Sequence, residues 1–434
     1  MITPQMQSAL GILVILTVAW LLSENRRAFP WRIAIVGIAL QAGIAVLLLK
    51  VPVARDALFG LNGIVTVLTE ATRAGTGFVY GFVGGGPSPF KPEALTTSPA
   101  ALTTFAFGIL PLVIIISALS AILWYWRILP IIVGAMAFVL RRTLGIGGAV
   151  GLGSAATVFL GNIEGSLVVR PYLPKITRTE LFILMTTGLS VVAGTVFVVY
   201  ANMLGGGCVP NPPPGSHCVL PGALGHILVA SMMSLPAAIV IASIMVPGDA
   251  ITSVTETDSG HKYHSTMDAM AKGTTDGLNI YMQIVAMLIV VTALVAIVNA
   301  VLGHVPPVWG APLTLQRLLG WVFAPVVWLF GVPWNEAQTA GSLLGTKTIL
   351  NEFVAYSNLV ALPAGSLDPR ATQIMVYAMC GFANFASVGI LIAGFGTLIP
   401  DRRDEIVPLA MWALISGTMA SGLTGAMIGL LPVT

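Results

Sequence analysis

Long apolar segments recur along the whole chain, and they constrain its fold more than any other feature. Crossing the hydrocarbon core of a bilayer takes an α-helix of about 20 mostly apolar residues. Segments that approach this length lie at 8–23, 31–50, 101–125, 180–204, 224–246, 278–303, 371–397 and 406–431. Hydrophobic residues make up 56% of the 434 residues and charged residues only 9%, whereas soluble domains carry about 25% charged residues. The sequence therefore predicts an all-α polytopic membrane protein with eight transmembrane helices.

The charge and the motif content exclude several classes of function. A formal net charge of +3 without a basic run does not indicate nucleic-acid binding. No nucleophile elbow, kinase motif set or phosphate-cradling loop is present, so no enzyme activity is expected. The apolar run at 9–22 lacks a basic leader and is followed by "NRR", which favours a first spanning helix over a cleaved signal.

The distribution of arginine and lysine predicts the sidedness of the helices, because these residues prefer cytoplasmic loops. They fall on one face if both termini lie outside and if 150–175 and 333–365 each enter and leave the membrane by the same face, as re-entrant hairpins. The basic residues that this arrangement gathers are Arg26, Arg27, Arg127, Arg141, Arg142, Arg170, Lys175, Arg178, Lys272, Arg402 and Arg403.

Two of the three cysteines flank a proline-rich loop, "CVPNPPPGSHC", which this topology places outside. Outside a bacterial cell the environment is oxidising, so a disulfide between Cys208 and Cys218 is one expectation. Two unpaired thiols are the alternative, and cysteine counting does not decide between them.

Two polar, glycine-rich stretches interrupt the apolar sequence, and each carries one acid. "GNIEGSLVVRPYL" (161–173) contains Glu164 and "GTKTILNEFVAY" (345–356) contains Glu352. Both lie in segments with two apolar arms, a polar tip and a closing proline, and both are followed by an apolar helix with a small-residue centre. This pattern predicts an inverted repeat of hairpin plus broken helix, which places a ligand site near the bilayer midplane.

An ionised carboxylate at membrane depth costs at least about 2.5–3.5 kcal/mol, so such an acid indicates a functional site. Glu164 and Glu352 occupy matching points of the two repeats, which favours a shared site for a small ligand rich in hydroxyl groups. The structural alternative is that each acid caps a half-helix or pairs with Arg170 or Lys347.

Other polar residues have weaker signals. Asn279, Tyr281 and Gln283 could edge a cavity, although interfacial anchoring better suits Tyr281. His261 and His264 lie in a polar segment that suits a cytoplasmic linker better than a metal site, because cysteine or acidic ligands at set spacing are missing.

The second acidic motif identifies a family. "GTKTILNEFVAY" resembles the G-x-K-x-x-x-N-E-F-V-A-Y signature of concentrative nucleoside transporters, "GNIEGSLVVRPYL" partly resembles their first hairpin, and "GFANFASVGI" resembles their seventh-helix motif. The resemblance implies a homotrimer in which a scaffold supports a mobile transport domain. The expected parts are peripheral helices 1–2 and an outer loop (1–100), scaffold helix 3 with a cytoplasmic interfacial helix (101–148), the first repeat (149–247), scaffold helix 6 with an outer amphipathic helix (278–331) and the second repeat (332–434).

The resemblance also implies roles for individual residues. Carried over by position, Glu352, Asn384 and Ser387 would hold the ribose, with Phe382 packing nearby. The residues that would read the base are Asn162, Ile163 and Glu164. Asn162 is one methylene shorter than the glutamine usual in the family.

The sequence departs from the family where sodium-coupled members bind Na⁺. Two of the three side-chain oxygens are replaced by aliphatic groups, although main-chain oxygens remain available. The aligned positions are Ile163, Thr157 and Val191 for side chains, with Leu160 and Val192 for the main chain. Proton coupling, known in other branches, is the expectation, with Glu164 and Glu352 as candidate proton carriers.

These observations predict a nucleoside:cation symporter, driven by H⁺ rather than Na⁺ and without a cofactor. It would import nucleosides across the bacterial inner membrane by an elevator-type movement. A sodium-coupled transporter and a carrier for a modified nucleoside are the alternatives within the fold. An intramembrane enzyme or a channel is the alternative from another class.

Overall fold

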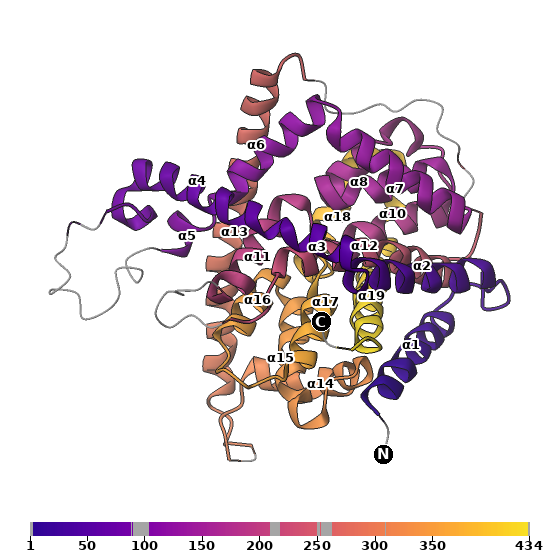
Figure 1. Ribbon diagram of the computed structural model, residues 1–434. Coiled ribbons are helices and arrows are strands. Elements are labelled where there is room, and N and C mark those ends of the chain that lie inside the picture. Colours follow the sequence, from indigo (N-terminus) through magenta and orange to yellow (C-terminus); the bar gives the residue numbers. More distant parts are fainter. Residues whose placement is uncertain are drawn as a thin grey trace.

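The protein is helical throughout the part that its computed structural model describes (Figure 1). The described residues are 3–87, 89, 104–208, 218–249, 252, 263–308 and 310–432. Within them a single isolated bridge, between Val308 and Ala311, is the only β-type pairing. An all-helical fold is what a bilayer requires, because a helix satisfies its own backbone hydrogen bonds.

Seven helices in the described residues are long and apolar enough to span a membrane. Two of them are helix pairs that continue each other, α5 with α6 and α10 with α11. The spans are α1 (Pro4–Leu21), α2 (Trp31–Lys50), α5 (Phe105–Gly108) with α6 (Leu112–Tyr125), α10 (Arg178–Ser190) with α11 (Gly194–Gly205), α12 (Ala223–Met245), α13 (Thr266–Leu302) and α19 (Arg403–Gly429).

The expected span at 371–397 is a broken helix, as the pattern of hairpin plus broken helix predicts. It is divided into α17 (Pro369–Met379) and α18 (Phe385–Leu398). The break follows from Asn384, whose side-chain Oδ1 accepts a hydrogen bond from the Ser387 N–H at 2.8 Å and thereby starts a new helix.

The segment 51–100 is not the long loop that hydropathy predicts. Its described part contains α3 (Pro52–Gly60), α4 (Asn62–Tyr80) and the short 3₁₀ helix η1 (Gly81–Gly84). Threonine hydroxyls bond back to the α4 backbone, for example Thr76 Oγ1 to the Thr72 carbonyl at 3.0 Å. A polar helix of this kind lacks the sustained apolar run by which a spanning helix is recognised.

Two helical hairpins complete the architecture. The first consists of α8 (Gly148–Leu160) and α9 (Asn162–Leu167), followed by the 3₁₀ turn η4 (Arg170–Tyr172). The second consists of α15 (Trp334–Ile349) and α16 (Glu352–Ala361). The remaining elements are α7 (Ile128–Leu144), α14 (Leu315–Phe330), η5 (Gly206–Cys208) and η6 (Pro400–Arg402). Between α14 and α15 the chain turns by 114°.

The base of the first hairpin lies at the face where several basic loops gather. Arg402 donates to the Ile176 carbonyl at 2.8 Å, and Arg178 pairs with Glu24 at 2.8 Å. The Glu24 N–H in turn donates to the carbonyl of Met245, at the end of α12. Segments that the positive-inside pattern places on one face are therefore in direct contact.

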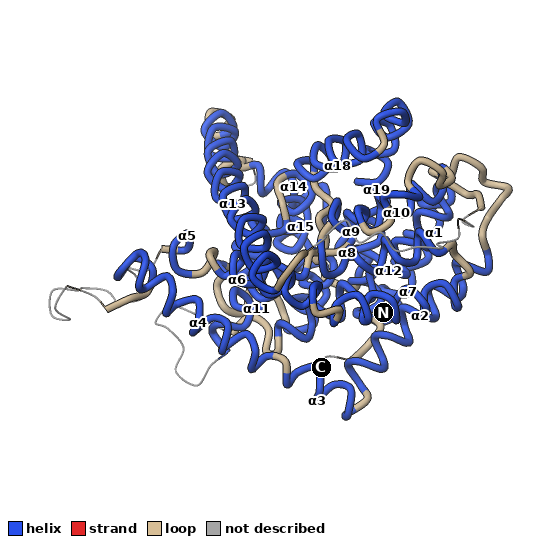
Figure 2. The backbone as a smooth tube through the Cα atoms, turned by 90° about the horizontal axis from the view of Figure 1, so that it is seen from above, coloured by secondary structure: helices blue, strands red, loops and turns tan. Residues whose placement is uncertain are grey.

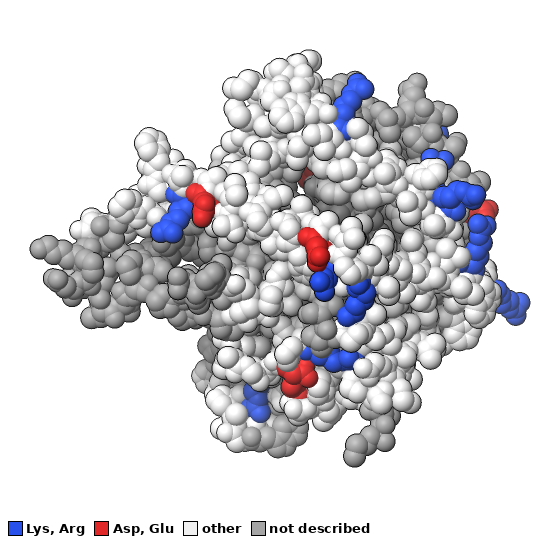
Figure 3. Space-filling view, in the orientation of Figure 1, with Lys and Arg blue, Asp and Glu red and all other residues white. Residues whose placement is uncertain are grey.

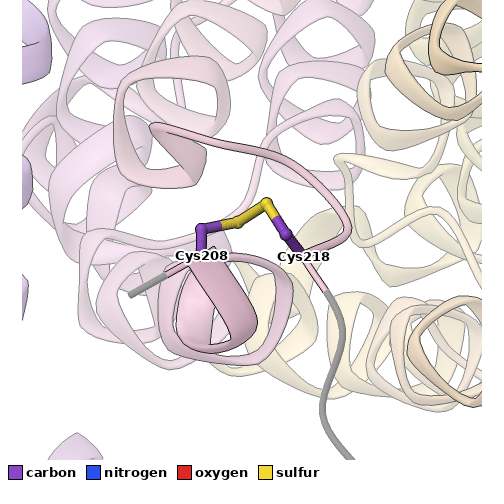
Figure 4. The surroundings of a disulfide bond; sticks show 2 residues. All are labelled: Cys208 and Cys218. Carbon is purple, nitrogen blue, oxygen red and sulfur yellow. A yellow bond between two sulfur atoms is a disulfide. The ribbon is translucent and has the colours of Figure 1, made fainter. Parts of the chain in front are cut away.

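The base of the second hairpin lies at the opposite face. The start of α12 adjoins the disulfide between Cys208 and Cys218 (Figure 4). Helix α12 has 23 residues and is therefore about 35 Å long, at about 1.5 Å per residue, so this end is far from Met245. A cavity of about 430 Å³ is lined both by 218–221 and by the loop 362–367 that leaves the second hairpin. The two hairpins thus enter from opposite faces.

Burial divides the helices into a central group and a peripheral group. The apolar window of α10 with α11 is 94% buried within the chain, whereas that of α13 is only 6% buried. Helix α13 lies along α6 at the edge of the molecule (Figure 2). Charged side chains are sparse on the face shown in Figure 3, and wide uncharged areas separate them. The exposed apolar surface is what a protein embedded in lipid presents.

Candidate functional site

The two broken helices meet at their breaks. The chain leaves helical geometry after α10 at 191–193 and after α17 at 380–384. The Phe382 N–H donates to the Val191 carbonyl at 3.3 Å. At Gly381 an added Cβ would fall 2.7 Å from the Ser190 carbonyl oxygen, so this close approach requires glycine. The crossing places four helix ends, with their unpaired backbone groups, at one point inside the protein.

The tip of the second hairpin carries a buried carboxylate to this crossing. Glu352 is 5% exposed and is the first residue of α16, whose N-cap is Asn351. Its Oε2 accepts a hydrogen bond from Nδ2 of Asn384 at 3.1 Å, and its Oε1 accepts one from the hydroxyl of Tyr200 at 2.8 Å. Each carboxylate oxygen therefore has one side-chain donor.

The structure brings together the residues expected to hold a ribose. Asn384 contacts Glu352 with its amide nitrogen and caps α18 at Ser387 with its amide oxygen. Ser387 is 8% exposed. Phe382 lies in the same break and is partly buried. Glutamate and asparagine are thus in direct contact, and serine lies in the first turn of the helix that the asparagine caps; these residue types offer acceptors and donors suited to hydroxyl groups.

The tip of the first hairpin reaches the crossing from the other side. Gly161 reverses the chain with a φ of 110°, and an added Cβ there would fall 3.4 Å from Cβ of Ala193. Asn162 is 9% exposed and packs against Gly188 of α10, where an added Cβ would fall 2.8 Å from Cγ of Asn162. The Oδ1 atom of Asn162 is buried without a hydrogen-bond partner.

Glu164 differs from Glu352 in its surroundings. Its carboxylate lies near the backbone N–H groups of Ile163 and of Glu164 itself, in the first turn of α9. Glu164 is exposed, whereas its neighbours Asn162, Gly165 and Ser166 are buried. The two carboxylates share no hydrogen-bond partner in the described residues, so the shared site for both acids stays a prediction.

Neither acid forms an ion pair within the described part of the chain. Lys347 is fully buried and donates to the hydroxyl of Ser421 at 3.3 Å, and Arg170 is exposed. Both acids do lie in the first turn of a half-helix, where the helix dipole favours negative charge. The acids are therefore placed favourably in the helix dipole, but the N-caps are Gly161 and Asn351, and salt bridging to Arg170 or Lys347 is not seen in the described residues.

The positions that align with a sodium site have apolar or occupied groups. The side chain of Ile163 packs on Gly394 of α18, where an added Cβ would fall 2.6 Å from its Cγ1. The Thr157 hydroxyl donates to the Gly153 carbonyl at 2.9 Å. Val191 and Val192 are fully buried and Leu160 is partly buried, and the Val191 carbonyl already accepts from Phe382.

Other sequence candidates lie away from this crossing or outside the described residues. His261 is one of the latter, and the His264 N–H donates to Asp268. Within the described ranges, no group of three or more His, Cys, Asp or Glu residues could hold a metal ion. Tyr281 is 5% exposed and belongs to the apolar core, so interfacial anchoring was the wrong expectation. Asn279 and Gln283 are exposed on α13.

Sequence reasoning missed Tyr200. It lies in the apolar stretch of α11 and is 2% exposed. Its only sequence signal is a phenol in a helix that follows the first hairpin, and a phenol of that kind is usually a core residue.

Opposed hairpins, crossed helix breaks and a polar cluster between them define an integral membrane carrier with a central ligand site. Family models described as "Na+ dependent nucleoside transporter" match this chain at its C-terminal part (226–429) and N-terminal part (10–83), and a "Nucleoside recognition" model matches 106–207. The chain is 34% identical to the uncharacterized transporter YutK of Bacillus subtilis, over 97% of this chain and 98% of that protein. The chain therefore belongs to the family of concentrative nucleoside transporters, whose members are transporters and not enzymes.

Named relatives and solved structures agree with this assignment. Nucleoside permease NupC of Helicobacter pylori is 31% identical over 99% of this chain and 98% of that one. Sodium/nucleoside cotransporter 1 of Rattus norvegicus is 29% identical over 99% of this chain and 64% of that protein. A structure of CNTnw in an inward-facing, substrate-bound state has a TM-score of 0.85 and 31% identity, and it covers 99% of this chain and 98% of that one.

Proposed function

We propose that this protein imports nucleosides through the bacterial inner membrane in symport with protons. The observation that carries the proposal is the buried Glu352 carboxylate, which is held at the crossing by Asn384, whose amide oxygen in turn accepts from the Ser387 N–H. A carboxylate with free lone pairs next to an amide and a hydroxyl binds vicinal hydroxyl groups, as in ribose. Such a site discriminates against analogues that lack a hydroxyl, because an unpaired buried group costs about 1–3 kcal/mol.

The choice of protons over sodium is supported by the first hairpin. Sodium prefers several oxygen ligands, and Ile163 and Val191 contribute no side-chain oxygen to the aligned positions. Ile163 instead packs on Gly394. Glu164 and Glu352 remain as the ionisable groups at the two tips and are the proposed proton carriers. The alternative is sodium coupling, supported by the family models, whose descriptions name Na⁺.

The transport movement is proposed to be elevator-like, within a homotrimer. Helices α6 and α13 suit a rigid scaffold because they pack closely through Gly273 and Gly277, where added Cβ atoms would fall 2.8 Å from the Ser117 carbonyl oxygen and 2.7 Å from Cα of Ile114. The scaffold also includes α14, and the hairpins with the helices that follow each of them form the mobile domain. Both termini and the disulfide face the periplasm in this arrangement.

The test is uptake into proteoliposomes that contain the purified protein. We expect uridine or adenosine to accumulate when the outside is more acidic than the inside, without sodium present. A sodium gradient at equal pH on both sides should give no accumulation. Accumulation driven by sodium alone would overturn proton coupling but leave nucleoside transport intact, and no nucleoside uptake under either gradient would overturn the proposed function.

A modified nucleoside is a second candidate substrate, favoured by the first tip. Asn162 is shorter than the usual glutamine, and its buried Oδ1 has no partner. The shorter side chain changes the base pocket, which could then accept a base that carries an additional group. Competition against labelled uridine by a panel of plain and modified nucleosides, free bases and sugars distinguishes the two candidates.

A further inference from the structure

Tyr200 connects the first repeat to the acid of the second. The residue belongs to α11, which follows the first hairpin, whereas Glu352 begins the second arm of the other hairpin. Their hydrogen bond, 2.8 Å long, joins residues 152 positions apart. Both side chains are at least 95% buried, so no solvent competes for this bond.

Packing fixes the position of the phenol. The Tyr200 ring lies 5.0 Å from the ring of Tyr356 and 6.1 Å from that of Phe353, both on α16. Two residues further along α11, Nδ2 of Asn202 donates to Oγ1 of Thr69 at 3.0 Å. The hydroxyl is therefore presented to the carboxylate by a side chain that has little freedom to move away.

The hydrogen bond from Tyr200 orients the Glu352 carboxylate, as its lone pairs show. A carboxylate offers about four acceptor positions on its two oxygens. Tyr200 occupies one on Oε1 and Asn384 occupies one on Oε2. The remaining positions are open to the N–H groups at the start of α16 and to a ligand, and the two side-chain donors on opposite oxygens fix the rotation of the carboxylate plane. A bond from a phenol to an anion is charge-assisted and about twice as strong as a neutral one.

We propose that Tyr200 is a positioning residue for ribose recognition. It holds the Glu352 carboxylate in the rotamer that turns its remaining lone pairs toward the sugar hydroxyls, and it acts only through Glu352. The inference deepens the proposed function and rests on it. It assigns part of the selectivity for the ribose to a residue of the first repeat that contacts no sugar atom.

The experiment compares Tyr200→Phe with Tyr356→Phe. Both changes remove one hydroxyl from a fully or almost fully buried ring, but the Tyr356 hydroxyl donates to the Val376 backbone carbonyl at 2.8 Å and not to Glu352. We expect Tyr200→Phe to raise the KM for uridine about tenfold, because a hydrogen bond to a charged group is lost, with the maximal rate changed by less than about twofold. Tyr356→Phe should leave the KM within about twofold of wild type, because its bond is neutral.

Ribose selectivity separates positioning from a general loss of structure. We expect Tyr200→Phe to reduce the preference for uridine over 3′-deoxyuridine, because a carboxylate held by Asn384 alone is less firmly oriented toward the 3′-hydroxyl. Tyr356→Phe should keep that preference. If Tyr200→Phe weakens both ligands equally, or behaves like Tyr356→Phe, the positioning role is wrong. If the wild-type protein transports no nucleoside, the proposed function itself fails.

A second variant covers the case in which Tyr200→Phe does not fold. Incorporation of 3,5-difluorotyrosine at position 200 keeps the ring and the hydroxyl but makes the phenol a stronger acid and a stronger donor. The preference for uridine over 3′-deoxyuridine should then change while the thermal unfolding temperature stays near that of wild type. An unchanged preference would overturn the positioning role.

Discussion

The two hairpin tips have the same backbone architecture, but their acids differ in burial and in hydrogen-bond partners. Each carries an acid in the first turn of a half-helix, and each reaches the crossing of the broken helices. At the second tip Glu352 is buried and accepts from Tyr200 and Asn384. At the first tip Glu164 is exposed, lies near the N–H groups at the start of α9, and has no side-chain donor within the described residues. The symmetry of the fold thus extends to the backbone and not to the side-chain environment.

Under the proposed function, this difference predicts that the two tips bind different parts of the nucleoside. A buried carboxylate with two fixed donors is pre-organised for one ligand geometry, which suits the constant part of a nucleoside, the ribose. An exposed carboxylate beside an unpartnered amide is less restricted, which suits the variable part, the base. Mutations at the two tips should therefore differ in their effects on uptake, and equal effects would show that the tips are functionally equivalent.

The largest expected effect is that of Glu352→Gln. The change replaces an acceptor oxygen by an amide donor that faces the donors of Tyr200 or Asn384, and buried donors would lose their partner. Charge-assisted bonds contribute about 1.5–3 kcal/mol each, so we expect uridine uptake to fall by about a hundredfold or more. Glu70→Gln, at an exposed position on α4, is the control and should transport like wild type. Normal uptake by the Glu352 variant would remove this residue from the site.

Glu164→Gln should have a smaller effect. The glutamine oxygen can still accept from the backbone N–H groups of Ile163 and residue 164, so the local capping remains. We expect a loss of about tenfold in uptake, together with an altered preference among bases, because one charged hydrogen bond to the ligand is replaced by a neutral one. Initial uptake rates for uridine, cytidine and adenosine provide the measurement. A loss as large as that of Glu352→Gln would mean that the two acids are equivalent.

Much of this asymmetry could not be derived from sequence. The hairpins, and the breaks in the helices that follow them, can be predicted because glycine, asparagine and an acid interrupt the apolar runs. A bilayer accepts such an interrupted segment only where its backbone is buried in protein or lines a cavity. The contact between Glu352 and Asn384 was expected from the family signature. The exposure of Glu164 was not, because it depends on which helices cover the first tip and not on the local residues.

Tyr200 and α4 are two further features that sequence patterns do not predict. Tyr200 lies in an apolar run whose pattern matches that of any core-facing helix, and its bond joins residues 152 positions apart, beyond the reach of local pattern. Helix α4 is short of apolar residues and rich in threonine, so a search for spans of about 20 apolar residues passes over it. Hydropathy therefore predicts the crossing helices well and the peripheral ones poorly.

The smallest expected effect concerns sodium at the first tip. Ile163→Thr combined with Val191→Ser returns two side-chain oxygens to the aligned positions. We expect sodium to stimulate uridine uptake by no more than about twofold, because Na⁺ needs several oxygens and the third aligned side chain, Thr157, is already bonded to the Gly153 carbonyl. The matched control is Ile163→Val with Val191→Ala, which removes similar bulk from the contact with Gly394 but adds no oxygen. Stimulation in the control as well would show that loosened packing, and not ion ligation, is responsible. A strong sodium dependence of the wild-type protein would mean that main-chain oxygens alone complete the ion site and that the aliphatic residues at this tip do not prevent it.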